Sequence, residues 1–290
     1  MFPRLSGNLR GGVLMALAAV IFAAEALTIR WMTARGIPVE VQLFARSFGQ
    51  LLWVAPLIAT SGLAVFRTER TGLHLLRGAA SVLTWGLYYA SFGPLDLATA
   101  TVLSFTNVMF TTLLAGPVLG ERVDRWRWAG TIAGLIGVAV MLRPGTTVST
   151  LGVALALGSA VSWCVITLSS RVLAQTERNS TVMAWVGVVA TAASAPFAAL
   201  AWVPLGALDL LMLLAVACVA PGIVWLITSA YRHGEASAIA PFQYLRLIVV
   251  AGFGWALFQE VPDGWTWLGA AVILVGALVI TVAEARRRWN

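Results

Sequence analysis

Long apolar stretches separated by short polar turns run along this chain from end to end. Each stretch is continuously apolar over about 20 residues and does not alternate with polar positions. A hydrocarbon core of about 30 Å needs about 20 residues of helix, whereas a half-buried strand would alternate. The pattern therefore predicts ten membrane-spanning helices, near residues 11–31, 40–61, 72–92, 97–119, 126–142, 150–172, 181–202, 207–231, 237–258 and 265–284.

The second half of the chain repeats the first about 139 residues later. Between Gly120 and Gly130 stand a Glu, an Asp, two Trp and a Gly, and the same residues return in register between Gln259 and Gly269. Five helices in each copy would place the copies upside down relative to each other. We therefore predict two repeats, residues 1–144 and 145–290, related by inversion, which is typical of alternating-access transporters.

Composition and charge place the chain in a bilayer. Hydrophobic residues make up 60% and charged residues 11%, against about a quarter charged in soluble domains. All 19 basic residues are arginine, and 14 of them, Arg77 included, are expected in the ends and loops on the side of the N-terminus, against three on the other side. By the positive-inside rule this bias makes both termini cytoplasmic, so the net charge of +7 sets orientation and does not indicate nucleic-acid binding.

Two ionisable residues lie about 9 Å deep in neighbouring predicted spans. Glu25 precedes the end of the first span by about six residues, and Arg46 follows the start of the second by about six. A charge at mid-bilayer costs from about 3 kcal/mol upward. Two hypotheses stay open: the residues form an ion pair that fixes packing, or they handle substrate or protons directly.

Arg246 lies in the middle of the ninth predicted span, and Asn107 is its counterpart in the repeat. Polar residues at symmetry-related positions in mid-membrane lie where an inverted-repeat transporter has its site. An arginine there can hold a substrate carboxylate through two hydrogen bonds. The alternative is that Arg246 caps backbone carbonyls or pairs with a distant glutamate.

Aromatic and small polar residues deep in the spans would suit a cavity for an apolar or aromatic metabolite. For each of them, ordinary helix packing is the alternative. These further binding candidates are Trp85, Tyr88, Ser104, Trp163, Thr167, Gln243 and Tyr244. Pro221 and Pro241 interrupt apolar spans and are candidate hinges.

These features resemble the EamA-type branch of the drug/metabolite transporter superfamily. The likeness is carried by Leu43-Phe44-Ala45-Arg46 early in the second span, by Gly120-Glu121 and Gln259-Glu260 at matching helix ends, and by the glycine-rich spans that follow. It implies an all-α integral membrane protein with ten transmembrane helices as a 5+5 inverted repeat, in the bacterial inner membrane. Length and aromatic content are similar to those of YddG-like amino-acid exporters.

Enzyme chemistry is not indicated by any motif. Without lysine the chain has no Walker A sequence, and we find no paired carboxylates, zinc-ligand spacing or Gly-x-Ser-x-Gly turn. The two cysteines lie inside apolar segments, so we expect no disulfide framework and no metal site. We expect no cofactor and no nucleic acid, only a small-molecule substrate and the lipid bilayer as partners, and a monomer.

The predicted function is that of a secondary transporter which exports small metabolites, amino acids including aromatic ones, by alternating access around a cavity between the repeats. The substrate class and the direction are what the resemblance implies. One alternative is a carrier of sugar phosphates or nucleotide sugars. Such anionic substrates need several basic residues in the cavity, and only Arg46 and Arg246 lie at depth in the predicted spans. The other is a membrane receptor or structural subunit that transports nothing.

Overall fold

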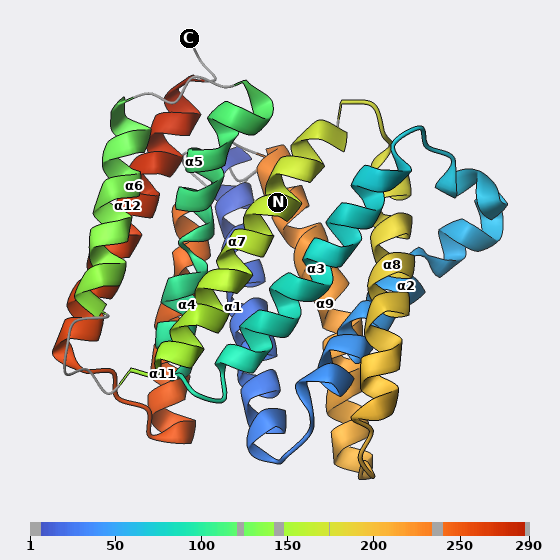
Figure 1. Cartoon of the computed structure of the whole chain (residues 1–290), viewed down its shortest axis with the longest axis horizontal. Coiled ribbons are helices and arrows are strands. Elements are labelled where there is room, and N and C mark those ends of the chain that lie inside the picture. The colour runs from blue at the N-terminus through green and yellow to red at the C-terminus, as the bar shows by residue number, and fades with distance from the viewer. Residues whose placement is uncertain (1–6, 121–124, 142–147, 174, 234–239, 288–290) are drawn as a thin grey trace, which may run out of the picture.

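The computed structural model describes residues 7–120, 125–141, 148–173, 175–233 and 240–287, and every regular element in these ranges is a helix (Figure 1). The all-α prediction is confirmed. The elements are α1 (Gly7–Ala34), α2 (Val39–Ser61), η1 (Gly62–Phe66), α3 (Thr71–Ser91), α4 (Leu97–Ser104), α5 (Asn107–Leu119), α6 (Arg125–Met141), α7 (Thr150–Leu173), α8 (Asn179–Leu200), α9 (Ala207–His233), η2 (Ala240–Tyr244), α11 (Leu245–Phe258) and α12 (Gly264–Arg287).

The outer surface of the bundle is apolar, as contact with lipid requires. Leu200, Leu63 and Ile248 are 88%, 82% and 70% exposed. Seven helices in the described ranges are long and apolar enough to cross a membrane. Helix α6 is not among the seven because it has only 17 residues. Helix α3 is not among them either, because polar residues such as His74 and Arg77 lower its mean hydropathy. The exact count of ten spans stays a prediction.

Helices of the first repeat pack mainly on helices of the second repeat. Helix α1 packs on α9, and its repeat partner α7 packs on α3, while α2 packs on α8 and α6 on α12. Figure 1 shows α1 ending at the lower edge, in the turn to α2, and α7 ending at the upper edge, beside α8. We call the lower edge the α1–α2 end and the upper edge the α2–α3 end. The equivalent helices therefore run in opposite directions, as an inverted repeat requires.

The span predicted over 97–119 is not one helix. Helix α4 ends at Ser104 and α5 begins at Asn107. Between them the N–H groups of Phe105 and Thr106 bond to carbonyls only three residues back, and the hydroxyls of Ser104 and Thr106 also donate to local carbonyls. Such side-chain bonds compete with the helical ladder, so the helix is interrupted there.

The span predicted over 237–258 is interrupted at the corresponding place. From residue 240 onward it consists of η2, ending at Tyr244, followed by α11. Tyr244 is the repeat counterpart of Phe105, and the two rings pack with their centroids 4.8 Å apart. Both helices α5 and α11 also end in a left-handed residue, at Gly120 (φ 68°) and Gln259 (φ 56°), which again are counterparts. The two interruptions therefore meet where the repeats face each other.

Helices α6 and α12 pack side by side through glycines that let the backbones approach closely (Figure 1). A Cβ added at Gly276 would lie 2.5 Å from the carbonyl oxygen of Gly130, and one added at Gly137 would lie 2.8 Å from that of Gly269. Real Cβ atoms do not come so near, because van der Waals repulsion forbids it. Only glycine therefore fits at these crossing points.

We predict that Gly276→Ala lowers the free energy of unfolding by about 1–3 kcal/mol, because the added methyl group overpacks the α6–α12 contact. Thermal unfolding of the purified protein in detergent measures this. Gly252→Ala is the matched control, since a Cβ at that helical position meets nothing within 4 Å. Equal melting temperatures for the two variants would contradict the close approach.

Candidate functional site

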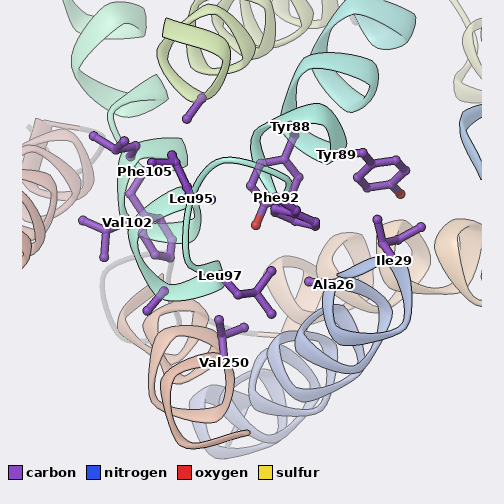
Figure 2. Close-up of a cluster of buried hydrophobic side chains, with 14 of the residues drawn as sticks. Ala26, Ile29, Tyr88, Tyr89, Phe92, Leu95, Leu97, Val102, Phe105 and Val250 are labelled. Carbon is purple, nitrogen blue, oxygen red and sulfur yellow. The ribbon is translucent and has the colours of Figure 1, made fainter. Parts of the chain in front are cut away.

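The α1–α2 end of the bundle contains tightly packed side chains, and none of them lines either of the two cavities described below. Ile29, Tyr88, Tyr89, Phe92 and Leu97 are each no more than 1% exposed, and Figure 2 shows them in one region, on α1, on α3 and the turn after it, and on α4. The Tyr88 hydroxyl also lies 3.1 Å from the Thr101 hydroxyl oxygen of α4. We call these five side chains the closed-end core, because they block a path through this end.

Two ion pairs join the repeats at the same end. Arg30 of α1 donates to Glu260 Oε1 from Nη2 at 2.7 Å and from Nε at 3.0 Å. Glu260 Oε2 accepts from the backbone N–H of Leu97 at 2.8 Å, at the start of α4, where the helix dipole favours a carboxylate. Arg35, in the turn directly after α1, donates to Asp209 of α9 at 3.0 Å. The closed end is therefore held by charge as well as by packing.

Arg246 lies beside a cavity of about 90 Å³ at the meeting point of the interrupted helices. Its guanidinium is buried between the rings of Phe22 and Phe105, 4.4 and 4.3 Å from their centroids. Nη2 donates to the Ser104 hydroxyl at 3.1 Å, and Nε is buried with no hydrogen-bond partner. Arg246 forms no ion pair with any carboxylate in the part of the chain described. A buried cation so placed is suited to an anionic ligand.

Arg46 lies beside a larger cavity of about 220 Å³, formed by α2, α3, α7, α8 and α9. One face of its guanidinium lies 3.6 Å from the centre of the Trp85 ring. Its Nη1 donates to Glu25 Oε1 and to the Tyr89 hydroxyl, the latter at 3.2 Å, and Tyr89 in turn donates to Glu25 at 2.9 Å. The charge of Arg46 is therefore balanced inside the protein.

Three aromatic rings separate the two cavities. The centroid of Phe22 lies 5.8 Å from that of Trp85 and 6.5 Å from that of Trp163, and the two tryptophan centroids lie 5.3 Å apart. Trp163 lines both cavities, Trp85 the larger and Phe22 the smaller. We call these three residues the aromatic wall. A planar ring can stack on it from either cavity.

Many of the residues predicted from the sequence come together here. Asn107, Gln243, Trp163 and Arg246 line the smaller cavity, and Ser104 bonds to Arg246. Arg46, Trp85 and Trp163 line the larger one. These positions are distant in the sequence and meet only because the repeats interlock.

Other predicted residues lie elsewhere. Tyr88 belongs to the closed-end core, Tyr244 packs on Phe105, and the Thr167 hydroxyl donates to the carbonyl of Trp163 one turn earlier. None of these three is among the residues that line either cavity. Pro221 lies inside α9, which continues through it, and Pro241 lies in η2.

The sequence analysis missed Phe22, Arg77 and Gln50, of which Phe22 lines the smaller cavity and the other two the larger. Phe22 stands in an unbroken apolar run, where no pattern marks one aromatic residue from its neighbours. Arg77 was assigned to the cytoplasmic border. A helical projection of α3 would have placed it on the face of Ser81 and Trp85, which are four and eight residues further on.

Comparison with known proteins agrees with this architecture. The sequence pattern of the EamA-like transporter family matches residues 9–143 and 150–282. A riboflavin transporter of Rhizobium johnstonii is 32% identical over 280 residues, covering 96% of this chain and 92% of that protein. An S-adenosylmethionine uptake transporter of Rickettsia prowazekii is 28% identical, covering 84% of this chain and 83% of the relative. A pseudopaline exporter of Pseudomonas aeruginosa is 27% identical, covering 94% and 96%.

A solved structure, described as "Crystal structure of protein", superposes on this chain with a TM-score of 0.61. The match covers 96% of this chain and 99% of the solved chain, at 21% identity, and so supports the fold.

The relatives named above are bacterial transporters and not enzymes, and the helices are those of a multi-pass protein of the inner membrane. The family pattern matches both halves, and the chain belongs to the EamA-like transporter family.

Proposed function

We propose that this protein is a secondary transporter for small metabolites that combine a planar ring with an acidic group, and that the acidic group binds Arg246 while the ring lies on the aromatic wall. The observation that carries this proposal is Arg246 itself. It is 7% exposed, its Nε is without a partner, and it borders a cavity.

A buried guanidinium without a counterion is costly, and a ligand carboxylate would offset that cost. Nε and one terminal nitrogen of an arginine form a fork that matches the two oxygens of a carboxylate. Asn107 and Gln243, which line the same cavity, supply further hydrogen-bonding groups for the polar end of a substrate. The neighbouring rings supply the apolar surface, since aromatic pairs gain energy from stacking.

Aromatic amino acids fit this description and are the first candidate substrates. Riboflavin is a second candidate for the aromatic wall alone, because a relative at 32% identity is named a riboflavin transporter and because the wall of three rings suits a flat ring system. Riboflavin carries no acidic group, so its binding would not use the charge of Arg246. Export is the direction that the resemblance implied, yet the relatives are named for uptake as well as export. We propose that the carrier is uncoupled and that its net direction follows the substrate gradient, since an uncoupled carrier transports in either direction.

We propose alternating access as the mechanism. Both cavities lie away from the closed-end core, and the Arg30–Glu260 and Arg35–Asp209 pairs tie one repeat to the other at the closed end. The helix interruptions lie at matching positions of the two repeats, where transporters with inverted repeats bind their substrates. Opening the closed end requires that these pairs separate.

We expect Arg246→Gln to weaken binding of phenylalanine about 10- to 100-fold, because a charge-assisted hydrogen bond contributes about 1.5–3 kcal/mol. Isothermal titration of the purified protein and counterflow in proteoliposomes both measure this. Arg178→Gln removes an exposed arginine and is the matched control. Unchanged affinity in Arg246→Gln would reject the proposed site.

Glu260→Gln is expected to raise the accessibility of the closed end, because a neutral amide holds Arg30 less strongly than a carboxylate does. The readout is the rate at which an impermeant maleimide labels a cysteine placed at Ala26, in a variant with Cys164 and Cys218 replaced by alanine. Glu40→Gln, which changes an exposed glutamate at the same end, is the control. Equal labelling rates in both variants would show that the pair does not hold this end closed.

The Glu25–Arg46 pair is proposed to be structural, since Arg46 and Tyr89 both donate to Glu25. Glu25→Gln leaves Arg46 without its counterion and should cost about 3–5 kcal/mol of stability, and Glu25→Gln with Arg46→Gln should cost less. Chemical unfolding in detergent compares the three proteins. Loss of the response to a pH gradient in Glu25→Gln, with stability unchanged, would instead make Glu25 a proton carrier.

A further inference from the structure

The larger cavity has positive charge of its own, separate from that of Arg246 in the smaller cavity. Two arginines line it, Arg46 from α2 and Arg77 from α3, and no acidic residue is among its lining residues. Arg46 is balanced by Glu25, as described above. Arg77 has no such partner, because its Nε donates at 2.9 Å to the neutral hydroxyl of Ser170 and it forms no ion pair with any described carboxylate.

Glu177, a described acid in the same region of the bundle, interacts with other residues. Glu177 accepts a hydrogen bond from the Thr68 hydroxyl at 2.6 Å and lies 4.0 Å from His74. The His74 ring is itself packed on Trp185, with the centroids 5.6 Å apart. Glu177 is therefore turned toward Thr68 and His74, and the charge of Arg77 is left for something in the cavity.

The rest of the cavity wall suits an acidic group attached to a ring. Ser47, Gln50 and Ser81 add polar side chains beside the two arginines. Trp163 lines this cavity and the smaller one that holds Arg246. A substrate ring stacked on Trp163 would therefore lie next to both cavities, one lined by Arg246 and the other by Arg46 and Arg77.

We propose that the larger cavity is a second anion subsite, in which Arg77, with Arg46 beside it, binds a phosphate monoester or a second carboxylate. This inference rests on the proposed function and narrows its substrate class to ring compounds with an additional acidic group. A phosphate monoester carries a charge of about −1.5 to −2 near pH 7 and three acceptor oxygens. A guanidinium matches these oxygens with two parallel hydrogen bonds.

From the sequence alone, phosphorylated substrates are less favoured, because only Arg46 and Arg246 lie at depth in the predicted spans. The structure adds Arg77 to the cavity wall and shows that Arg46 is neutralised by Glu25. Two cations without carboxylate partners, Arg77 and Arg246, therefore face the two cavities. This count favours a substrate with two acidic groups over one with a single carboxylate.

Matched pairs of ligands test the subsite, since each pair differs only in the phosphate. The pairs are tyrosine with O-phosphotyrosine and riboflavin with riboflavin 5′-phosphate, titrated calorimetrically into the full-length protein in detergent. In the wild type the phosphorylated member of at least one pair should bind about 10-fold or more tightly than its parent. Arg77→Gln should remove this preference, and a cooperative thermal unfolding transition in detergent shows that the variant is folded.

Two further variants sharpen the result. Arg77→Lys keeps a point charge and should retain a reduced preference for phosphate. Arg67→Gln removes an exposed arginine at the same end of the bundle and should retain the full preference. A wild type that binds the parents with no preference for phosphate, or a preference that survives in Arg77→Gln, overturns the subsite alone. Failure of all four ligands to bind overturns the proposed function together with it.

Discussion

Burial of guanidinium charge inside an apolar bundle is the constraint on which the rest of this structure depends. Three buried or half-buried arginines interact with different partners. Arg30 pairs with Glu260 of the other repeat, and Arg46 pairs with Glu25 of the same repeat. Arg246 contacts only aromatic ring faces and a hydroxyl among the described residues. Only the third arrangement leaves the charge uncompensated. We propose that an acidic group of the substrate supplies the missing counterion.

The inverted repeat places that group where it can act. The interruptions at Phe105 and Tyr244 are counterparts, and their rings pack against each other where the repeats meet. Polar side chains lie beside these interruptions. The Ser104 hydroxyl accepts a hydrogen bond from Arg246, and Gln243 lines the smaller cavity.

The two ends of the bundle differ although the repeats are equivalent. At the α1–α2 end, the closed-end core is buried and two ion pairs join the repeats. Toward the middle and the α2–α3 end, the same helices leave cavities of about 220 and 90 Å³. Alternating access requires this asymmetry, because a carrier open at both ends would be a leak.

The sequence by itself determined the helical class, the repeat and the membrane setting, because hydrophobic length and the 139-residue recurrence are local or periodic signals. It also singled out Arg246, Arg46 and Glu25, since an ionisable residue in an apolar run is visible without a structure. Only the tertiary structure decided that Glu260 meets Arg30 across 230 residues, that Phe22 joins Trp85 and Trp163, and that Arg77 faces a cavity. Those outcomes depend on how helices distant in the chain rotate and pack against one another, which no single run of residues encodes.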